Sequence, residues 1–208
     1  MRTATVITTL LVLTVVFPTA KADEKDLLTG KELVEALRKG GYVLYMRHPQ
    51  TNEDQADTDT MNLSNLKAQR HLSDKGREQA RAFGEALKAL KIPIAQVLTS
   101  MFYRAIETAK LADLGKPDSH LDLTEPQNVS PKEGKRRAAE LRKILGTPPT
   151  AGTNVLIVGH RPCLQDAVGK DVGDMAEGEC VIYKPEAEGK FKMIARVKID
   201  SWSEWAKK

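Results

Sequence analysis

Short apolar runs alternate along this chain with longer stretches in which apolar residues recur every three or four positions. The runs have the length and composition of buried strands and lie at residues 42–46, 94–98 and 154–158. The stretches predict amphipathic helices at residues 29–39, 73–90 and 102–114 and around 136–145. Cys180–Tyr183 and Phe191–Val197 flank a Glu188-Gly189 turn and predict a hairpin or edge pair that closes the sheet. Strands that alternate with helices predict an α/β fold.

Local signals mark where some of these elements begin. Thr29 to Glu32 has the form of a capping box, and Ser73 is placed to cap the long second helix. The polar segment Gln50–Asn65 predicts a loop that overhangs the end of the first strand. Its acidic residues suggest calcium, but the glycine and terminal glutamate of an EF-hand loop are missing, so a solvated loop is preferred. Lys116–Pro131 predicts a second long connection.

The N-terminus predicts a secretory signal peptide over residues 1–22. Met1-Arg2 is a short basic start, residues 6–17 are mostly apolar, and Ala20-Lys21-Ala22 supplies a small-x-small cleavage pattern. The apolar run is shorter than the roughly 20 residues that span a bilayer, so we expect no stable membrane insertion after cleavage, with a retained anchor as the alternative. Residues 23–208 are then a single exported domain, periplasmic or secreted.

Charge and composition argue against a nucleic-acid partner. The net charge of the 208 residues is +4, and loss of Arg2 and Lys21 with the leader lowers it by two to +2. Aromatic residues make up 5% of the chain, whereas proteins that bind single strands usually combine a basic groove with stacking rings. We therefore interpret the basic run Lys135-Arg136-Arg137 as a solvated helix face that can also steer anionic substrates.

Cys163 and Cys180 are the two cysteines of the chain. An oxidising compartment permits a disulfide between them, and two small buried thiols are the other interpretation. Neither cysteine has the neighbours of a catalytic or zinc-binding thiol.

Candidate chemistry gathers at the carboxyl ends of three predicted strands. Arg47-His48 follows the first strand, Ser100 with Arg104 follows the second, and Gly159-His160 follows the strand at 154–158. Ligands of open α/β sheets bind at this edge, so the residues predict an anion site beside a nucleophile.

Together these motifs resemble the histidine phosphatase superfamily, also called the phosphoglycerate mutase-like family. Its Arg-His-Gly-x-Thr opening is matched by Arg47-His48-Pro49 and Thr51. Its Ser-x-x-x-Arg-Ala-x-x-Thr-Ala motif and its late Gly-His are matched by Ser100, Arg104-Ala105, Thr108-Ala109 and Gly159-His160, and its usual lead into the first long helix by Leu72-Ser73, Gly76 and Gln79-Ala80.

The resemblance implies a three-layer α/β/α sandwich with a mostly parallel central sheet and a phosphohistidine intermediate on His48. Arg47, Arg104 and His160 would form the phosphate pocket, with Thr51 at the family's threonine position. No metal and no cofactor is implied. The expected activity is that of an exported, metal-independent phosphomonoesterase acting on a small-molecule phosphomonoester or an envelope sugar phosphate.

The general acid is expected from the second long connection, where Leu123-Thr124-Glu125 resembles the family's Leu-x-Glu pattern. A general acid must hold its proton near the working pH, and Glu125 is the candidate. An exposed loop glutamate is the other interpretation of this residue. Asp166 and Glu179 are the weaker candidates.

Two residues depart from the family pattern. Pro49 replaces a glycine, removes an N–H donor and confines His48 to extended backbone angles. Arg161 follows the late histidine where acid-phosphatase relatives have aspartate, and we expect it to pair with a surface carboxylate. An alternative function is therefore a catalytically impaired module that binds phosphate or a sugar phosphate in the cell envelope. A third is an envelope interaction protein that uses its basic helix or a docking surface at Trp202 and Trp205; no feature indicates an oligomeric state.

Overall fold

A six-stranded sheet forms the centre of the protein in the computed structural model, which describes residues 27–169 and 172–208. The strand order is β3-β2-β4-β1-β5-β6. The strands are β1 (Val43–Arg47), β2 (Ile94–Ser100), β3 (Pro117–His120), β4 (Asn154–Gly159), β5 (Cys180–Pro185) and β6 (Phe191–Val197). The first four are parallel, β5 pairs antiparallel with β1, and β6 pairs antiparallel with β5, which confirms the predicted hairpin and a mostly parallel sheet. The predicted signal peptide, residues 1–22, lies outside the described residues.

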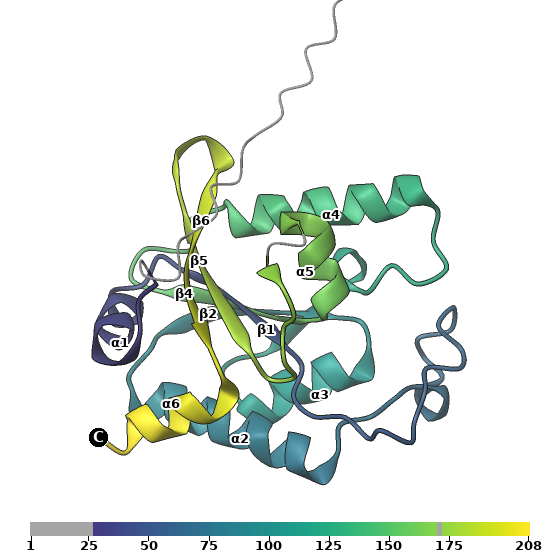
Figure 1. Ribbon diagram of the computed structural model, residues 1–208, viewed down its shortest axis with the longest axis horizontal. Helices are drawn as coiled ribbons and strands as arrows, with labels where there is room; N and C mark the ends of the chain where they lie inside the picture. The colour runs from purple at the N-terminus through teal and green to yellow at the C-terminus, as the bar shows by residue number, and fades with distance from the viewer. Residues whose placement is uncertain (1–26, 170–171) are drawn as a thin grey trace, which may run out of the picture.

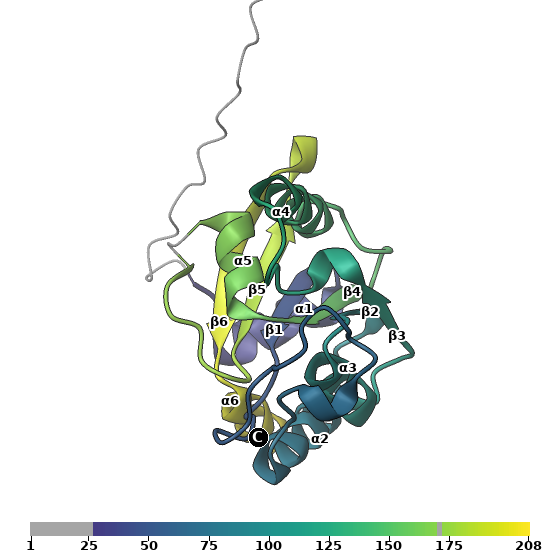
Figure 2. The same cartoon turned by 90° about the vertical axis from the view of Figure 1, so that its right-hand side faces the viewer.

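Helices cover both faces of the sheet, so the predicted three-layer α/β/α architecture is confirmed (Figure 1, Figure 2). One face packs against α1, α2, α3 and α6, and the other packs against α4 and α5. The helices are α1 (Gly30–Lys39), α2 (Asp74–Ala89), α3 (Tyr103–Ala112), α4 (Pro131–Leu145), α5 (Arg161–Val168) and α6 (Ile199–Ala206). Among the described residues, no helix combines the length and apolarity that a membrane crossing requires.

Strand β1 lies inside the sheet, and the alternation of its side chains explains its continuous apolar run. Leu44 and Met46 enter the core beneath α1, α2 and α6, whereas Val43 and Tyr45 enter the core beneath α4 and α5. All four are fully buried. Arg47 pairs in register with Gly159 of β4, so the next residue of each strand, a histidine in both cases, emerges at the same edge.

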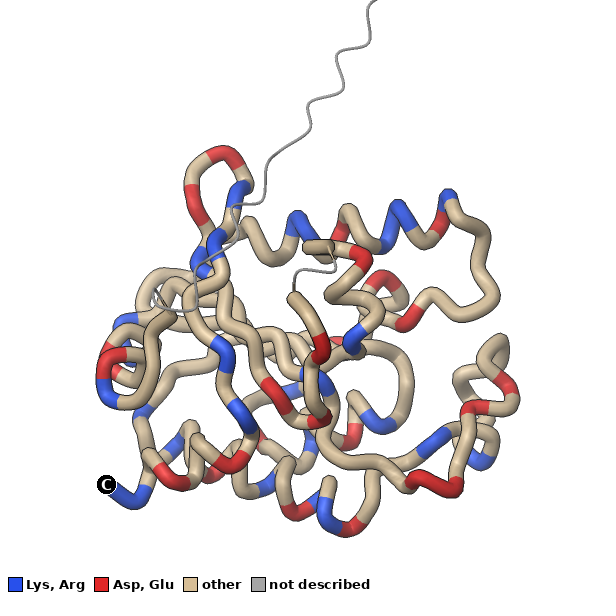
Figure 3. Tube along the Cα trace, viewed as in Figure 1, with Lys and Arg blue, Asp and Glu red and all other residues tan. Residues whose placement is uncertain are grey.

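Two expectations about the helices need correction. Thr29 precedes α1, but its side chain makes no capping hydrogen bond, whereas the Ser73 hydroxyl does accept one from Gly76 N at 3.1 Å. Arg137 is not on a solvated face: it is buried and donates to Glu133 and to Thr124 O. Lys and Arg do recur along the outer side of α4, interrupted by acidic residues (Figure 3).

The C-terminal segment is core, not a docking surface. Trp202 is fully buried and meets Phe83 of α2 edge to face, with ring centroids 5.8 Å apart. The helix α6 that carries it packs along α2 (Figure 1). An interaction protein working through Trp202 is therefore excluded.

The two cysteines are buried free thiols on opposite faces of the sheet. Cys163 lies in the core beneath α4 and α5, and Cys180 lies in the core on the other side of the sheet. The sheet between them rules out a disulfide within the chain, so the second interpretation of this pair is correct.

Candidate active site

The residues predicted from three strand ends meet in one buried cluster. His48 N donates to Gly159 O at 3.1 Å, and the His48 and His160 rings meet edge to face with centroids 5.3 Å apart. Each imidazole is 2% exposed, and Arg104, at the start of α3, is 1% exposed. Two imidazoles and a guanidinium without contact to bulk water form a site for a charged group that is itself removed from water.

Gly159 allows Tyr45 to fix the backbone of His160. The Tyr45 hydroxyl donates to His160 O at 2.8 Å and accepts from His160 N at 3.0 Å. A Cβ at position 159 would lie 2.4 Å from that hydroxyl, closer than such atoms approach. Burial raises the pKa of Tyr45 well above its usual value, so the hydroxyl keeps its proton. The Gly-His motif therefore places the late histidine on a rigid support.

Pro49, which replaces the glycine of the family pattern, determines which ring nitrogen of His48 carries the proton. Nδ1 lies 2.9 Å from Pro49 O, and a carbonyl can only accept, so Nδ1 carries the hydrogen. Burial and the charges of Arg104, Arg47 and Arg70 hold the pKa of His48 well below its usual value. The neutral ring then keeps a free lone pair on Nε2, the form that a nucleophile needs.

His160 is oriented from β2. Its Nε2 lies 2.8 Å from the Ser100 hydroxyl, which accepts from Phe102 N at 3.1 Å and has its own hydrogen to give to Nε2, so that Nδ1 can carry the ring hydrogen. Burial and Arg104 hold the pKa of His160 well below its usual value. Its Nδ1 lies 3.9 Å from a Glu125 carboxylate oxygen, so this nitrogen is the one available to the pocket.

Arg104 carries the one buried guanidinium nitrogen that lacks a partner in the described part of the chain. Its NH1 donates to Asp57 at 2.9 Å, its NH2 lies 3.8 Å from Glu125, and the guanidinium stacks 4.3 Å above the Phe102 ring. Its Nε is buried without an acceptor. An unpaired donor on a buried cation is costly, and a bound anion supplies the missing acceptor.

Arg47 and Thr51 converge on Glu177, in the loop before β5. The Arg47 guanidinium donates to Met175 O at 2.6 Å and to Glu177 at 3.4 Å. The Thr51 hydroxyl donates to the same carboxylate at 2.8 Å. Thr51 therefore holds Glu177, and Arg47 keeps further N–H donors in its planar fork for a ligand.

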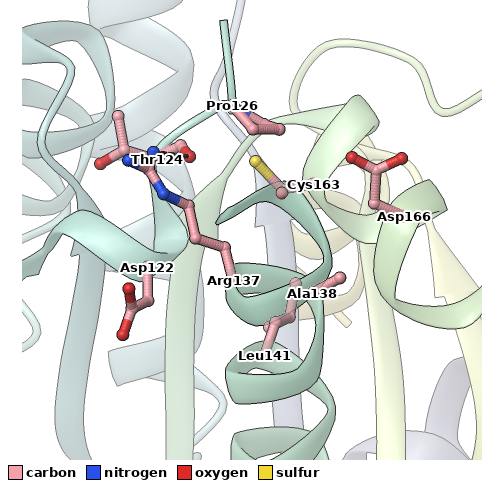
Figure 4. Close-up of a pocket in the computed structure, with 9 residues that line it drawn as sticks. Asp122, Thr124, Pro126, Arg137, Ala138, Leu141, Cys163 and Asp166 are labelled. Atoms are coloured by element: carbon pink, nitrogen blue, oxygen red, sulfur yellow. Dashed lines mark hydrogen bonds between the residues drawn. The ribbon is translucent and has the colours of Figure 1, made fainter. Parts of the chain in front are cut away.

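Glu125, the predicted general acid, lies 3.8 Å from Arg104 NH2 and 3.9 Å from His160 Nδ1. Thr124 fixes it, because its hydroxyl accepts from Met101 N at 2.9 Å and its carbonyl accepts from Arg137 at 3.3 Å. Asp166 lies elsewhere, on α5, where it lines a small cavity with Pro126 and Arg137 (Figure 4).

Glu179, the other weaker candidate, forms an ion pair with Arg196 at 2.7 Å. Arg161 pairs with the exposed Asp174, as expected.

The start of α2 supports the segment that follows His48. Gly76 lets Gln50 approach so closely that a Cβ there would lie 2.0 Å from Gln50 O. Gln79 accepts from Gln50 N at 3.3 Å, and Leu72 bridges to Thr51. The motif that leads into the first long helix thus holds the residues that follow His48.

Two carboxylates of the site were missed from the sequence. Asp57 was assigned to a solvated loop, and Glu177 stands in a segment without a motif. Both become recognisable only when the fold opposes them to Arg104 and Arg47. In the described residues, no group of three or more His, Cys, Asp and Glu side chains is arranged to hold a metal ion.

Comparison with protein families finds one match. The model of the histidine phosphatase superfamily (branch 1) matches residues 43–125, which include the first two motifs and Glu125. No curated protein sequence matches the chain. The predicted resemblance to this superfamily is confirmed.

Solved structures share the fold. The protein histidine phosphatase SixA, solved with tungstate, is 20% identical with a TM-score of 0.56, over 76% of this chain and 97% of that one. A mycobacterial glucosyl-3-phosphoglycerate phosphatase is 16% identical with a TM-score of 0.55, over 76% and 100%. The phosphoserine phosphatase of Entamoeba histolytica, solved with 3-phosphoglyceric acid, is 12% identical with a TM-score of 0.56, over 77% and 98%. At these identities the comparisons show the phosphoglycerate mutase-like fold.

Proposed function

We propose that this protein is a phosphatase that hydrolyses phosphomonoesters through a phosphohistidine on His48. The premise is that the chain resembles the histidine phosphatase superfamily (branch 1) in its motifs and in its fold. The observation that carries the proposal is that two groups of the same pocket lack a partner. The neutral His48 ring has a free Nε2, and the Arg104 Nε is a buried donor without an acceptor. The lone pair of His48 Nε2 can attack an electrophile, and the Arg104 Nε can bind an anion. A phosphoryl group is both an electrophile and an anion.

Turnover divides into two transfers. In the first, His48 Nε2 attacks phosphorus, the P–O bond to the alcohol breaks, and Glu125 gives its proton to the departing oxygen. Arg47, Arg104 and His160 Nδ1 hold the charge on the equatorial oxygens. In the second, the Glu125 carboxylate takes a proton from water, the water oxygen attacks phosphorus, and the P–N bond breaks to release orthophosphate.

The proposal extends to the kind of substrate and to its location. Structural neighbours were solved with tungstate and with 3-phosphoglyceric acid, which supports a small phosphomonoester as substrate. The basic start, apolar run and small-x-small pattern of residues 1–22 support export to the periplasm or beyond. In that compartment an envelope sugar phosphate is a candidate substrate.

The test is hydrolysis of an aryl phosphate in the presence of a chelator. We expect turnover by the wild type, a loss of at least about a thousandfold in kcat for His48→Ala and a comparable loss for Arg104→Ala. His120→Ala is the matched control, because that imidazole is exposed and pairs with Asp118. An acid-labile phosphoenzyme that forms in the wild type and not in His48→Ala identifies the nucleophile. Wild-type turnover that survives in His48→Ala overturns the assignment.

A phosphate-binding module without turnover is the second candidate, and one observation favours it. Pro49 lacks the N–H that a glycine would offer a bound phosphate, and the Thr51 hydroxyl is occupied by Glu177. This candidate predicts that the wild type binds tungstate tightly but hydrolyses no phosphomonoester, and that Pro49→Gly restores turnover. If the wild type is active and Pro49→Gly stays within about tenfold of it, the missing N–H is not required and the binding module is excluded.

A further inference from the structure

Arg70 adds a third guanidinium to the histidine pocket. It lies just before α2 and is half-buried. Its charge contributes to the lowered pKa of His48, of His160, of Arg47 and of Arg104. A cation that acts on all four groups belongs to the pocket and not to a remote surface.

The backbone of Arg70 is fixed relative to Arg104. Arg70 N donates to Asp57 Oδ1 at 2.9 Å, and the same oxygen accepts from Arg104 NH1 at 2.9 Å. The preceding residue, Gln69, is buried and accepts from Tyr103 N, at the start of α3, at 2.8 Å. One carboxylate oxygen and one amide thus hold Arg70 beside the phosphate pocket.

The guanidinium of Arg70 differs from the other two in having no partner. Arg104 pairs with Asp57, and Arg47 pairs with Glu177. Over residues 27–169 and 172–208, the Arg70 side chain makes neither a hydrogen bond nor an ion pair. An arginine whose backbone is bonded to Asp57 but whose guanidinium pairs with no carboxylate retains all its N–H donors for a ligand.

We propose that Arg70 is a specificity-determining residue that binds a second anionic group of the substrate. The preferred substrates are then small phosphomonoesters with a carboxylate or a second phosphate a few bonds from the ester oxygen. This inference rests on the proposed function for the group that is transferred. The pocket otherwise opposes a second negative charge, because Asp57, Glu125 and Glu177 already face it, and Arg70 offsets that repulsion.

The test uses three two-carbon phosphomonoesters that differ at the far end. The far group is a hydroxyl in 2-hydroxyethyl phosphate, a carboxylate in phosphoglycolate and a phosphate in ethane-1,2-diol bisphosphate. Hydrolysis is measured for the wild type, Arg70→Gln and Arg70→Lys. Arg81→Gln is the matched control, because it removes the same charge from an exposed position on α2.

We expect the wild type to prefer at least one anionic compound, by about tenfold or more in kcat/KM. Arg70→Gln abolishes that preference, because it lowers kcat/KM for the preferred anionic compound by about tenfold more than for 2-hydroxyethyl phosphate. Arg70→Lys retains part of the preference, and Arg81→Gln retains all of it. A preference for the carboxylate identifies an acid as the second group, and a preference for the bisphosphate identifies a phosphate. Equal losses on all three compounds in Arg70→Gln, or no wild-type preference, overturn the inference.

A binding measurement separates this inference from the proposed function. The affinities of the same three compounds are measured by calorimetry on His48→Ala, with and without Arg70→Gln. An anionic preference that depends on Arg70 in a protein without turnover upholds the inference while the proposed function fails. A preference that does not depend on Arg70 overturns the inference, whatever the wild type hydrolyses.

Discussion

His48 is held neutral by its surroundings, and this has a consequence for stability. Its pKa and that of His160 are held well below the usual value, first by burial and then by Arg104. In the unfolded chain both histidines titrate near their ordinary pKa of about 6.5. Below that pH the unfolded chain binds protons that the folded protein does not. The contribution of the neutral rings to stability is therefore present above pH 6.5 and is lost as the pH falls.

We predict that the free energy of unfolding falls between pH 6.5 and 5.0. Each histidine contributes a slope that approaches about 1.4 kcal/mol per pH unit. Urea unfolding at several pH values measures this slope. His48→Gln removes one of these two titrating groups and lowers the slope by the contribution of that group. Equal slopes in the wild type and in His48→Gln would show that His48 is not held neutral.

At the residue scale, the sequence identified the groups that follow strands and missed those on irregular segments. His48, Arg104 and His160 stand at strand ends or one turn later, where topology alone brings them together. Asp57 and Glu177 lie in segments whose paths depend on many weak contacts. A carboxylate in such a segment resembles a solvated one until the arginine it faces is known.

Ser73 and Thr29, the two predicted N-cap residues, differ in whether the side chain caps its helix. Ser73 accepts from Gly76 N and also donates to Gln50 O at 3.3 Å, so the cap joins α2 to the segment after His48. Thr29 is exposed, and its side chain makes no capping bond to α1. Sequence alone gives both residues the same status, because the capping pattern does not report the side-chain rotamer.

We predict that Ser73→Ala lowers the free energy of unfolding by about 1 kcal/mol, the usual contribution of an N-cap. Thr29→Ala is the control and changes stability by less than about 0.5 kcal/mol. Chemical denaturation of the two variants measures both values. A larger loss in Thr29→Ala than in Ser73→Ala would contradict the assignment of the caps.

Among whole elements, the strongly periodic helices and the buried strands were predictable, and the short polar ones were not. The residues of β3, Pro117–His120, are mostly exposed and pair only with β2, so no apolar pattern marks them. The opposite error concerns α6, where the tryptophans suggested a surface. One helical turn of apolar residues has the same sequence pattern on a docking surface and in a core. Only the packing of Trp202 on Phe83 shows that this turn is core.

At the scale of the whole molecule, the sheet separates the two thiols, and burial raises the pKa of each. We predict that a thiol reagent labels neither cysteine rapidly in the native protein. In denaturant without reductant, it labels two thiols per chain. Dithiothreitol leaves the melting temperature unchanged, because no disulfide stabilises the fold. Fewer than two thiols in the denatured, unreduced protein would contradict this assignment.

The position of β1 inside the sheet also sets the order in which the site can form. Its neighbours β4 and β5 both come late in the chain, and Tyr45 and His160, which hydrogen-bond to each other, are 115 positions apart. Contacts between such distant positions form late in folding, because a long loop must close first. A growing chain that has not yet completed β4 therefore carries His48 without His160 and without a strand beside it. The two histidines therefore come together only when β4, from the second half of the chain, pairs with β1.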